Sequence, residues 1–218
     1  MADPIRFLFD YISPYAYVAW HGVRAIAAKH GRAVEPEPIL FAALLDAHGQ
    51  LGPAEIPAKR RYVFRDALRK AHAHGLALTP PPRHPFNPLP ALRIARLLDG
   101  ADRQRAIDAC FAATWGGGGG IDEPAALAGL LTAAGLDGPM LLAAAGEQPA
   151  KDALRDATAD AIREVLGVPT IIVDGELFWG ATASHVDAWL AGEDPVPVDL
   201  DARWQDLPTG AVRPGSRR

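Results

Sequence analysis

A long helical stretch that separates two short strand-bearing ends is the feature that most constrains the fold of this chain. From 57 to 146 the apolar residues recur at helical spacing, whereas apolar runs typical of strands occur only before and after this stretch. The strands must therefore come from both ends of the chain and pair across a helical insertion. Within the insertion we expect helices at 59–74, 88–99, 103–114, 123–134 and 138–145.

The N-terminal end reads as a strand, a helix and a second strand. Residues 5–9 form an apolar run typical of a short buried strand. Ser13 and Pro14 then supply a favoured N-cap and a favoured first position for a helix that ends near Gly31. Residues 33–41 contain the apolar residues Val34, Ile39, Leu40 and Phe41, interrupted by two prolines that cannot donate to a ladder, so we expect an edge strand there.

The C-terminal end reads as a helix, a hairpin and a last helix. A helical pattern at 151–166 leads into a strand at 170–173. The Asp-Gly pair that follows is typical of a tight hairpin turn, and 176–179 is the partner strand. A helix at 184–191 completes this end.

The order of these elements favours an α/β fold, a thioredoxin-like domain with a large inserted all-helical domain. Val168 and Pro169 directly precede an apolar strand, where that fold places a cis proline that exposes the preceding backbone to a ligand. We assign 1–45 and 150–192 to the thioredoxin-like domain, 46–149 to the inserted helical domain and 193–218 to an extended C-terminal tail.

Charge and composition narrow the class of partner. The chain has 22 basic and 26 acidic residues, and a formal net charge of -4 argues against a nucleic-acid or anionic membrane partner. No segment approaches the roughly 20 apolar residues of a membrane span. A single cysteine, Cys110, excludes an intramolecular disulfide, and the histidines show no metal-ligand spacing. We expect a cytoplasmic protein that binds a small molecule and no metal.

Ser13 occupies a position suited to an anion, because it begins a helix directly after a strand. Backbone N–H groups and the helix dipole stabilise a negative charge there by about 0.3 to 1 kcal/mol, and by up to ~2 when partly buried. In redox enzymes of the thioredoxin type this position holds the first cysteine of a C-x-x-C pair, so serine excludes dithiol exchange. The alternative is that Ser13 acts only as an N-cap.

The segment 9–17, Phe-Asp-Tyr-Ile-Ser-Pro-Tyr-Ala-Tyr, resembles the signature of the 2-hydroxychromene-2-carboxylate isomerases and of the related kappa-class glutathione transferases. Further segments that resemble blocks of this family are 57–62 with Asp66, 85–89 with Arg93, 167–170 and 173–180. The resemblance implies a glutathione-dependent isomerase of aromatic degradation that acts as a homodimer.

In the family reaction, which the resemblance implies here, the glutathione thiolate adds to the hydroxychromene carboxylate and the ring opens. Rotation about the resulting single bond and loss of the thiolate then give the benzylidenepyruvate. The resemblance makes Ser13 the catalytic residue, which would hydrogen-bond the sulfur. The residues that it assigns to glutathione are Ser13, Tyr15, Lys59, Asn87, Val168, Pro169 and Thr182.

One departure from the family concerns the γ-glutamyl end of glutathione. The family places an aspartate and an arginine where this chain has Thr182 and Ala183, so a charge-assisted contact to the ammonium group is lost. Ser184 as an N-cap and Asp187 as a helix-face acid both have ordinary structural explanations.

Several residues stay open between a role in the site and a structural role. Lys59, Arg60 and Arg83 are candidate cations for a substrate carboxylate, and each could equally be a solvated charge. Among the aromatic residues, Tyr11, Tyr15, Phe178 and Trp179 are candidates for a pocket wall or for the core. The function stays open too, between an isomerase, a kappa-like glutathione transferase and a thioredoxin-fold binding protein without catalysis.

Overall fold

The computed structural model describes residues 2–197, 204, 207–208 and 210–211, so most of the expected tail at 193–218 lies outside the described residues. A four-stranded sheet has the order β2-β1-β3-β4. The strands are β1 (Ile5–Phe9), β2 (Val34–Pro38), β3 (Thr170–Val173) and β4 (Glu176–Trp179).

The sheet joins the two ends of the chain, as the sequence predicts. β1 pairs parallel with β2 and antiparallel with β3, with Phe7 opposite Ile171, and β3 forms an antiparallel hairpin with β4. β1 is central, and Phe7, Leu8 and Phe9 are fully buried. β2 lies at an edge of the sheet. Its two prolines lack the N–H that a strand with neighbours on both sides needs, and an edge strand tolerates this loss.

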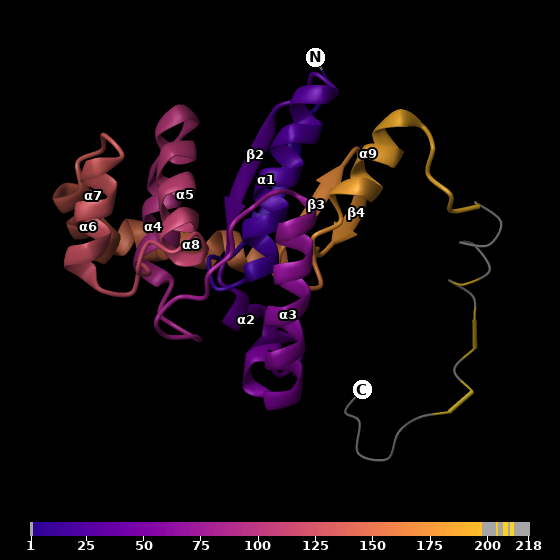
Figure 1. The fold of residues 1–218 in the computed structure, drawn as a ribbon, viewed down its shortest axis with the longest axis horizontal. Helices are drawn as coiled ribbons and strands as arrows, with labels where there is room; N and C mark the ends of the chain where they lie inside the picture. The colour runs from indigo at the N-terminus through magenta and orange to yellow at the C-terminus, as the bar shows by residue number, and fades with distance from the viewer. Residues whose placement is uncertain (1, 198–203, 205–206, 209, 212–218) are drawn as a thin grey trace.

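Helices surround this sheet (Figure 1). They are α1 (Pro14–Lys29), α2 (Phe41–Ala47), α3 (Pro57–Ala73), α4 (Leu89–Leu97), α5 (Gly100–Trp115), α6 (Pro124–Ala133), α7 (Gly138–Gly146), α8 (Gln148–Ile162) and α9 (Ala183–Ala191), with a short 3-10 helix at Pro53–Glu55. In Figure 1, α4 to α7 gather at one side of the sheet and α9 lies at the other. The thioredoxin-like fold with a helical insertion is thus confirmed, whereas the exact domain boundaries stay a prediction.

Several boundaries differ from the sequence prediction, among them those of α8, which spans Gln148–Ile162 and not 151–166. The strand expected to extend to 41 ends at Pro38, because the amides of Leu40 and Phe41 donate to the side chains of Thr158 and Asp10 and leave the ladder. The helix α2 that follows was not expected. The last helix begins at Ala183, so Thr182, and not Ser184, stands at its N-cap.

The core extends from the sheet into the helical insertion. The Phe9 and Tyr11 rings lie 5.4 and 4.9 Å from the ring of Phe111 on α5. Cys110, beside Phe111, is buried, as the sequence predicts, and burial raises the pKa of its thiol to about 12. The sheet and the insertion therefore share a continuous core. Among the described helices, none combines the length and the apolar character needed to cross a membrane.

Asp10 ties three elements together at the end of β1. Its carboxylate accepts hydrogen bonds from the amides of Ile12 and Phe41, each at 3.0 Å, and the side chain is buried. Burial raises the pKa of Asp10 to about 7, although the two amide hydrogen bonds act in the opposite direction.

This pKa predicts a specific dependence of stability on pH. Between about pH 4 and about pH 7 the folded protein retains a proton on Asp10 that the unfolded chain releases, so its contribution to the free energy of unfolding falls as pH rises through this range. We expect the difference in unfolding free energy between wild type and Asp10→Asn to change by about 2 to 4 kcal/mol across the range. Urea denaturation of both proteins measures it, and parallel pH profiles would contradict the assignment.

Candidate functional site

Ser13 begins α1 at the place where the chain leaves the sheet. Its Oγ accepts a hydrogen bond from the amide of Ala16 at 3.2 Å, so the N-cap expected from the sequence is present. The hydroxyl hydrogen remains available to donate to another group. The side chain is 8% exposed and lines a cavity. A negative atom placed there would meet one hydroxyl donor and the positive end of a helix.

The backbone before Pro169 faces the same cavity. The Val168–Pro169 peptide is cis, as the sequence predicts, and the carbonyl of Pro169 accepts from the amide of Gly180 at 2.8 Å. Within the described part of the chain, neither the amide nor the carbonyl of Val168 has a hydrogen-bond partner. Since Val168 and Ser13 line one cavity, this free donor and acceptor can pair with an extended peptide ligand.

The cavity has a volume of about 620 Å³ and mostly apolar walls. Its lining comes from the turn before α1, from α2 and the segment after it, from the first turns of α3 and from the end of β4. The apolar side chains of this lining include Phe41, Leu45, Leu51, Val63, Phe64 and Trp179, and the polar ones are Ser13, Asp46, Gln50, Glu55, Arg60, His84 and the Tyr15 hydroxyl. Such a site suits a ligand with an apolar body and a few polar groups.

Tyr15 lines the cavity, but its hydroxyl is engaged with α3. The hydroxyl donates to the carboxylate of Asp66 at 2.8 Å, and Lys70 lies 3.8 Å from the same carboxylate. Burial, followed by the hydrogen bond to Asp66, raises the pKa of Tyr15. Tyr15 is therefore a neutral residue that links the first turn of α1 to α3.

The structure brings some of the residues expected at the site together and leaves others apart. Lys59 and Asn87 are exposed and do not line the cavity of Ser13, and the Asn87 side chain accepts from the amide of Leu89 at 3.1 Å. Thr182 lies just beyond the cavity residue Gly180, with its hydroxyl 3.5 Å from the Gly180 carbonyl. Of the residues that the sequence assigns to glutathione, Tyr15 and Val168 line the cavity together with Ser13.

Among the candidate aromatic and acidic residues, some line the cavity and others have structural contacts elsewhere. Trp179 lines the cavity, whereas Tyr11 is fully buried in the core. Phe178 packs against Trp189 of α9, with ring centroids 6.2 Å apart. Asp187 is bound by Lys29 and His30, each at 2.7 Å, so its structural explanation holds.

His84 is a cavity residue that the sequence did not single out for this site. Its Nε2 lies 2.9 Å from the carbonyl of Ile12, directly before Ser13, and its Nδ1 is buried without a partner among the described residues. Burial lowers the pKa of His84, and the positive charge of Arg60 lowers it further. The only sequence signal is its place in a proline-rich segment, which by itself predicts a loop.

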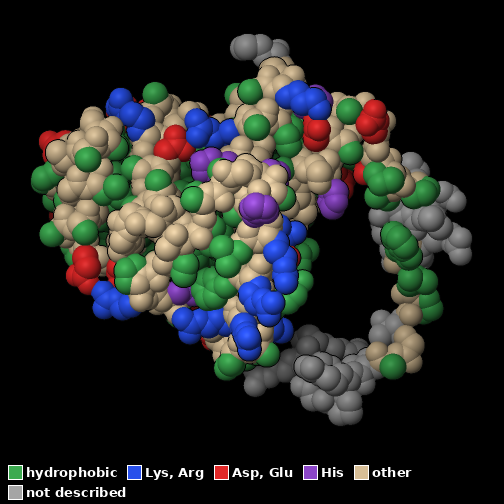
Figure 2. Space-filling view, in the orientation of Figure 1, with side chains coloured by type: hydrophobic (Ala, Val, Ile, Leu, Met, Phe, Trp, Pro, Cys, Tyr) green, Lys and Arg blue, Asp and Glu red, His purple; other side chains and the backbone are tan. Residues whose placement is uncertain are grey.

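Positive charge collects along α3, next to the cavity. Figure 2 shows a row of Lys and Arg side chains over this helix. The basic residues of α3 are Lys59, Arg60, Arg61, Arg65, Arg69 and Lys70. Although the whole chain has a formal net charge of -4, this helix presents a local positive surface. Among the described residues no group of three or more His, Cys, Asp or Glu side chains could hold a metal ion.

Comparison with known proteins confirms the resemblance expected from the sequence. Three curated proteins named 2-hydroxychromene-2-carboxylate isomerase match, and the one from Pseudomonas putida is 28% identical over 81% of this chain and 88% of its own. A glutathione S-transferase kappa 1 from Caenorhabditis elegans is 33% identical, over 36% of this chain and 35% of its own.

The solved structures and the family comparison agree on the fold. A 2-hydroxychromene-2-carboxylate isomerase structure superposes with a TM-score of 0.76 at 24% identity, covering 94% of this chain and 99% of the other. Residues 4–186 match the DSBA-like thioredoxin domain. The match extends from β1 into α9 and includes both Ser13 and the cis proline. This chain therefore belongs to the family of DSBA-like thioredoxin domains.

Proposed function

We propose that this protein is a glutathione-dependent isomerase that acts on an aromatic-derived carboxylate by addition and loss of a thiolate at Ser13. The three relatives named 2-hydroxychromene-2-carboxylate isomerase support the reaction class. The observation that carries the proposal is the placement of the Ser13 hydroxyl and the free backbone of Val168 on one cavity. This pair of features fits a cysteine-containing peptide.

Ser13 would hold the sulfur of the bound peptide as a thiolate. The Ser13 oxygen accepts from the amide of Ala16, and its O–H remains free to donate to the sulfur. The donated hydrogen bond and the helix dipole both favour the charged sulfur and lower the pKa of the thiol. Glutathione would supply the soft nucleophile, which is regenerated at the end of the reaction.

The chain's own thiol is unsuited to this role. Cys110 is fully buried on α5, and burial raises the pKa of its thiol to about 12. Serine at position 13 also removes the nucleophile that disulfide-exchanging thioredoxin folds place there. An external thiol is therefore the nucleophile in this proposal.

Asp46 is our candidate for the partner of the γ-glutamyl ammonium group. The family aspartate is replaced by Thr182, which does not line the cavity of Ser13. Asp46 lies on α2, lines the cavity of Ser13, and has no ion pair among the described residues. Its carboxylate would restore the charge-assisted contact that is lost with the family aspartate.

The partial match to a kappa-class glutathione transferase supports a second candidate function. A transferase would leave the sulfur bonded to the electrophile, whereas an isomerase releases it. With 2-hydroxychromene-2-carboxylate as substrate, we expect a product of unchanged mass and a constant concentration of free glutathione. Mass spectrometry and thiol titration distinguish the two functions, because a stable glutathione adduct that accumulates with turnover would identify a transferase.

Replacing Ser13 tests the thiolate site directly. In Ser13→Ala we expect glutathione affinity to fall at least about tenfold, because a hydrogen bond to a charged group contributes about 1.5 to 3 kcal/mol. We also expect the pKa of the bound thiol to rise by about one unit. Calorimetry measures the first, and thiolate absorbance as a function of pH measures the second. Ser184→Ala, an exposed change on α9, is the matched control. Equal thiol pKa values in both variants would contradict the role of Ser13.

Replacing Asp46 tests the ammonium partner. We expect Asp46→Asn to bind glutathione several-fold more weakly, because it loses one charge-assisted contact of about 1.5 to 3 kcal/mol that solvent partly screens. Wild type should prefer glutathione over its analogue without the amino group, and the variant should lose this preference. Asp156→Asn, on the exposed face of α8, is the control. An unchanged preference in Asp46→Asn would assign the ammonium group to another partner.

A further inference from the structure

The outer face of α3 carries positive charge that no carboxylate in the described part of the chain neutralises. Arg61, Arg65 and Arg69 recur every fourth residue, so their side chains lie in one row along the helix. All three are exposed, and the one ion pair of α3 among the described residues joins Lys70 to Asp66. Figure 2 shows the basic side chains of this helix on the molecular surface.

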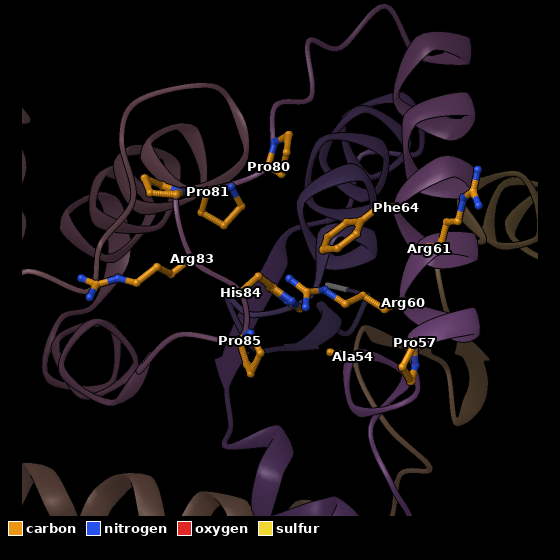
Figure 3. A pocket seen from close by; sticks show the side chains of 11 residues that line it. Ala54, Pro57, Arg60, Arg61, Phe64, Pro80, Pro81, Arg83, His84 and Pro85 are labelled. Carbon is orange, nitrogen blue, oxygen red and sulfur yellow. The ribbon is translucent and has the colours of Figure 1, made fainter.

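This arginine row faces away from the candidate site. Figure 3 shows a cavity of about 810 Å³ between the first turns of α3 and the segment 80–85. Arg60 and Phe64 point into this cavity, whereas the side chain of Arg61 points away from it. The row that begins at Arg61 is therefore a surface separate from the lining of the cavity of Ser13, which includes none of its three arginines.

The row has the properties of a surface that binds a partner. Like charges four residues apart repel each other and destabilise a helix, so an anion that binds along the row would stabilise α3. Two large side chains beside the row, Tyr62 and Leu68, are 62% and 45% exposed. A face that combines unpaired cations with exposed apolar groups fits an acidic segment that also carries apolar residues.

The segment 193–207, which follows α9, has this complementary chemistry. Its acidic residues outnumber its basic residues by five to one. Its apolar residues include Trp204 and Leu207, which are 62% and 65% exposed, so the described residues leave most of their surface uncovered. The part of the chain that matches the family ends at residue 186, before this segment begins.

The segment is long enough to reach α3 from the end of α9. Both helices pack against α1, whose 16 residues span about 24 Å. Packed helices lie about 8 to 10 Å apart, so crossing α1 adds about 20 Å in the perpendicular direction. The fourteen residues from Glu193 to Asp206 span up to about 46 Å when extended. This length exceeds the path over α1.

We propose that the C-terminal segment 199–207 docks on the outer face of α3 of the same chain, with its aspartates paired to the arginine row and its apolar residues against Tyr62 and Leu68. Because both surfaces belong to one chain, the segment meets α3 at an effective concentration on the order of millimolar, so individually weak ion pairs suffice. The contact is independent of the function proposed above, since it uses no residue assigned to the thiol.

A spin label at Gln205→Cys tests this contact in the full chain. Cys110 is fully buried and its thiol pKa is raised to about 12, so the label reacts with the introduced cysteine alone. Nuclear magnetic resonance then measures the paramagnetic broadening of each backbone amide. Circular dichroism and the unfolding midpoint establish that each variant is folded.

We expect strong broadening at the amides of Arg65 and Arg69, and none on α6 and α7, which lie at the other side of the sheet (Figure 1). Raising the salt from 0.1 to 1 M shortens the Debye length from about 10 to about 3 Å, so the broadening should be lost. Arg65→Gln/Arg69→Gln should lose it too. Arg155→Gln/Arg163→Gln, which removes two exposed charges at α8, is the matched control and should retain it.

Asp199→Asn/Asp201→Asn tests the contact from the segment's side and should also lose the broadening, whatever the stability of the arginine variants. Absence of broadening on α3 in the labelled protein, or its persistence in either double variant, would overturn the proposal. In a mixture of labelled protein and unlabelled ¹⁵N protein we expect no broadening, because its appearance would assign the segment to a second copy. Binding of the protein to phosphatidylserine vesicles, without broadening on α3, would assign the row to a membrane surface instead.

Discussion

The hydrogen bonds that hold the turn between β1 and α1 are the constraint on which the candidate site depends. In this turn, backbone amides and carbonyls form hydrogen bonds with side chains and not with a neighbouring strand. The amide of Ile12 donates to Asp10, the carbonyl of Tyr11 accepts from the Trp115 indole at 2.8 Å, and the carbonyl of Ile12 contacts His84. Trp115 and His84 both belong to the helical insertion. The insertion thus fixes the position of Ser13, although Ser13 itself lies in the sheet-bearing part of the chain.

This arrangement explains which parts of the molecule the sequence predicts well. The strands and most helices follow from local patterns, because β1 is a continuous apolar run and α1 begins with a serine and a proline. The cis peptide before Pro169 was expected from its place ahead of an apolar strand. By contrast, α2 is short and has no side-chain cap from its own N-cap residue, and its first amide, that of Phe41, donates to Asp10. A contact between residues so far apart in sequence leaves no local pattern.

The same limit applies to the site. Ser13 and the backbone of Val168 were predicted from the sequence because each lies at a position defined by its neighbours in sequence. The sequence offered three candidate cations, and only the structure separates them. Arg83 is paired with acidic residues, Lys59 faces solvent and Arg60 lines the cavity of Ser13. His84 was not predicted for a related reason, since its position beside the Ser13 turn is set by contacts with Ile12 and Phe64, which are distant in sequence.

The proline-rich segment 80–85 has a consequence for how this protein can diversify. It contributes no strand to the sheet. His84 and Pro85 line the cavity of Ser13, whereas residues 80–83 lie beside that cavity and are not part of its lining. An exchange confined to 80–83 would therefore change the neighbouring surface and leave the lining of the thiol site intact. In the proposed function, these four positions are the part that selection, or an engineer, can vary to obtain a new substrate range.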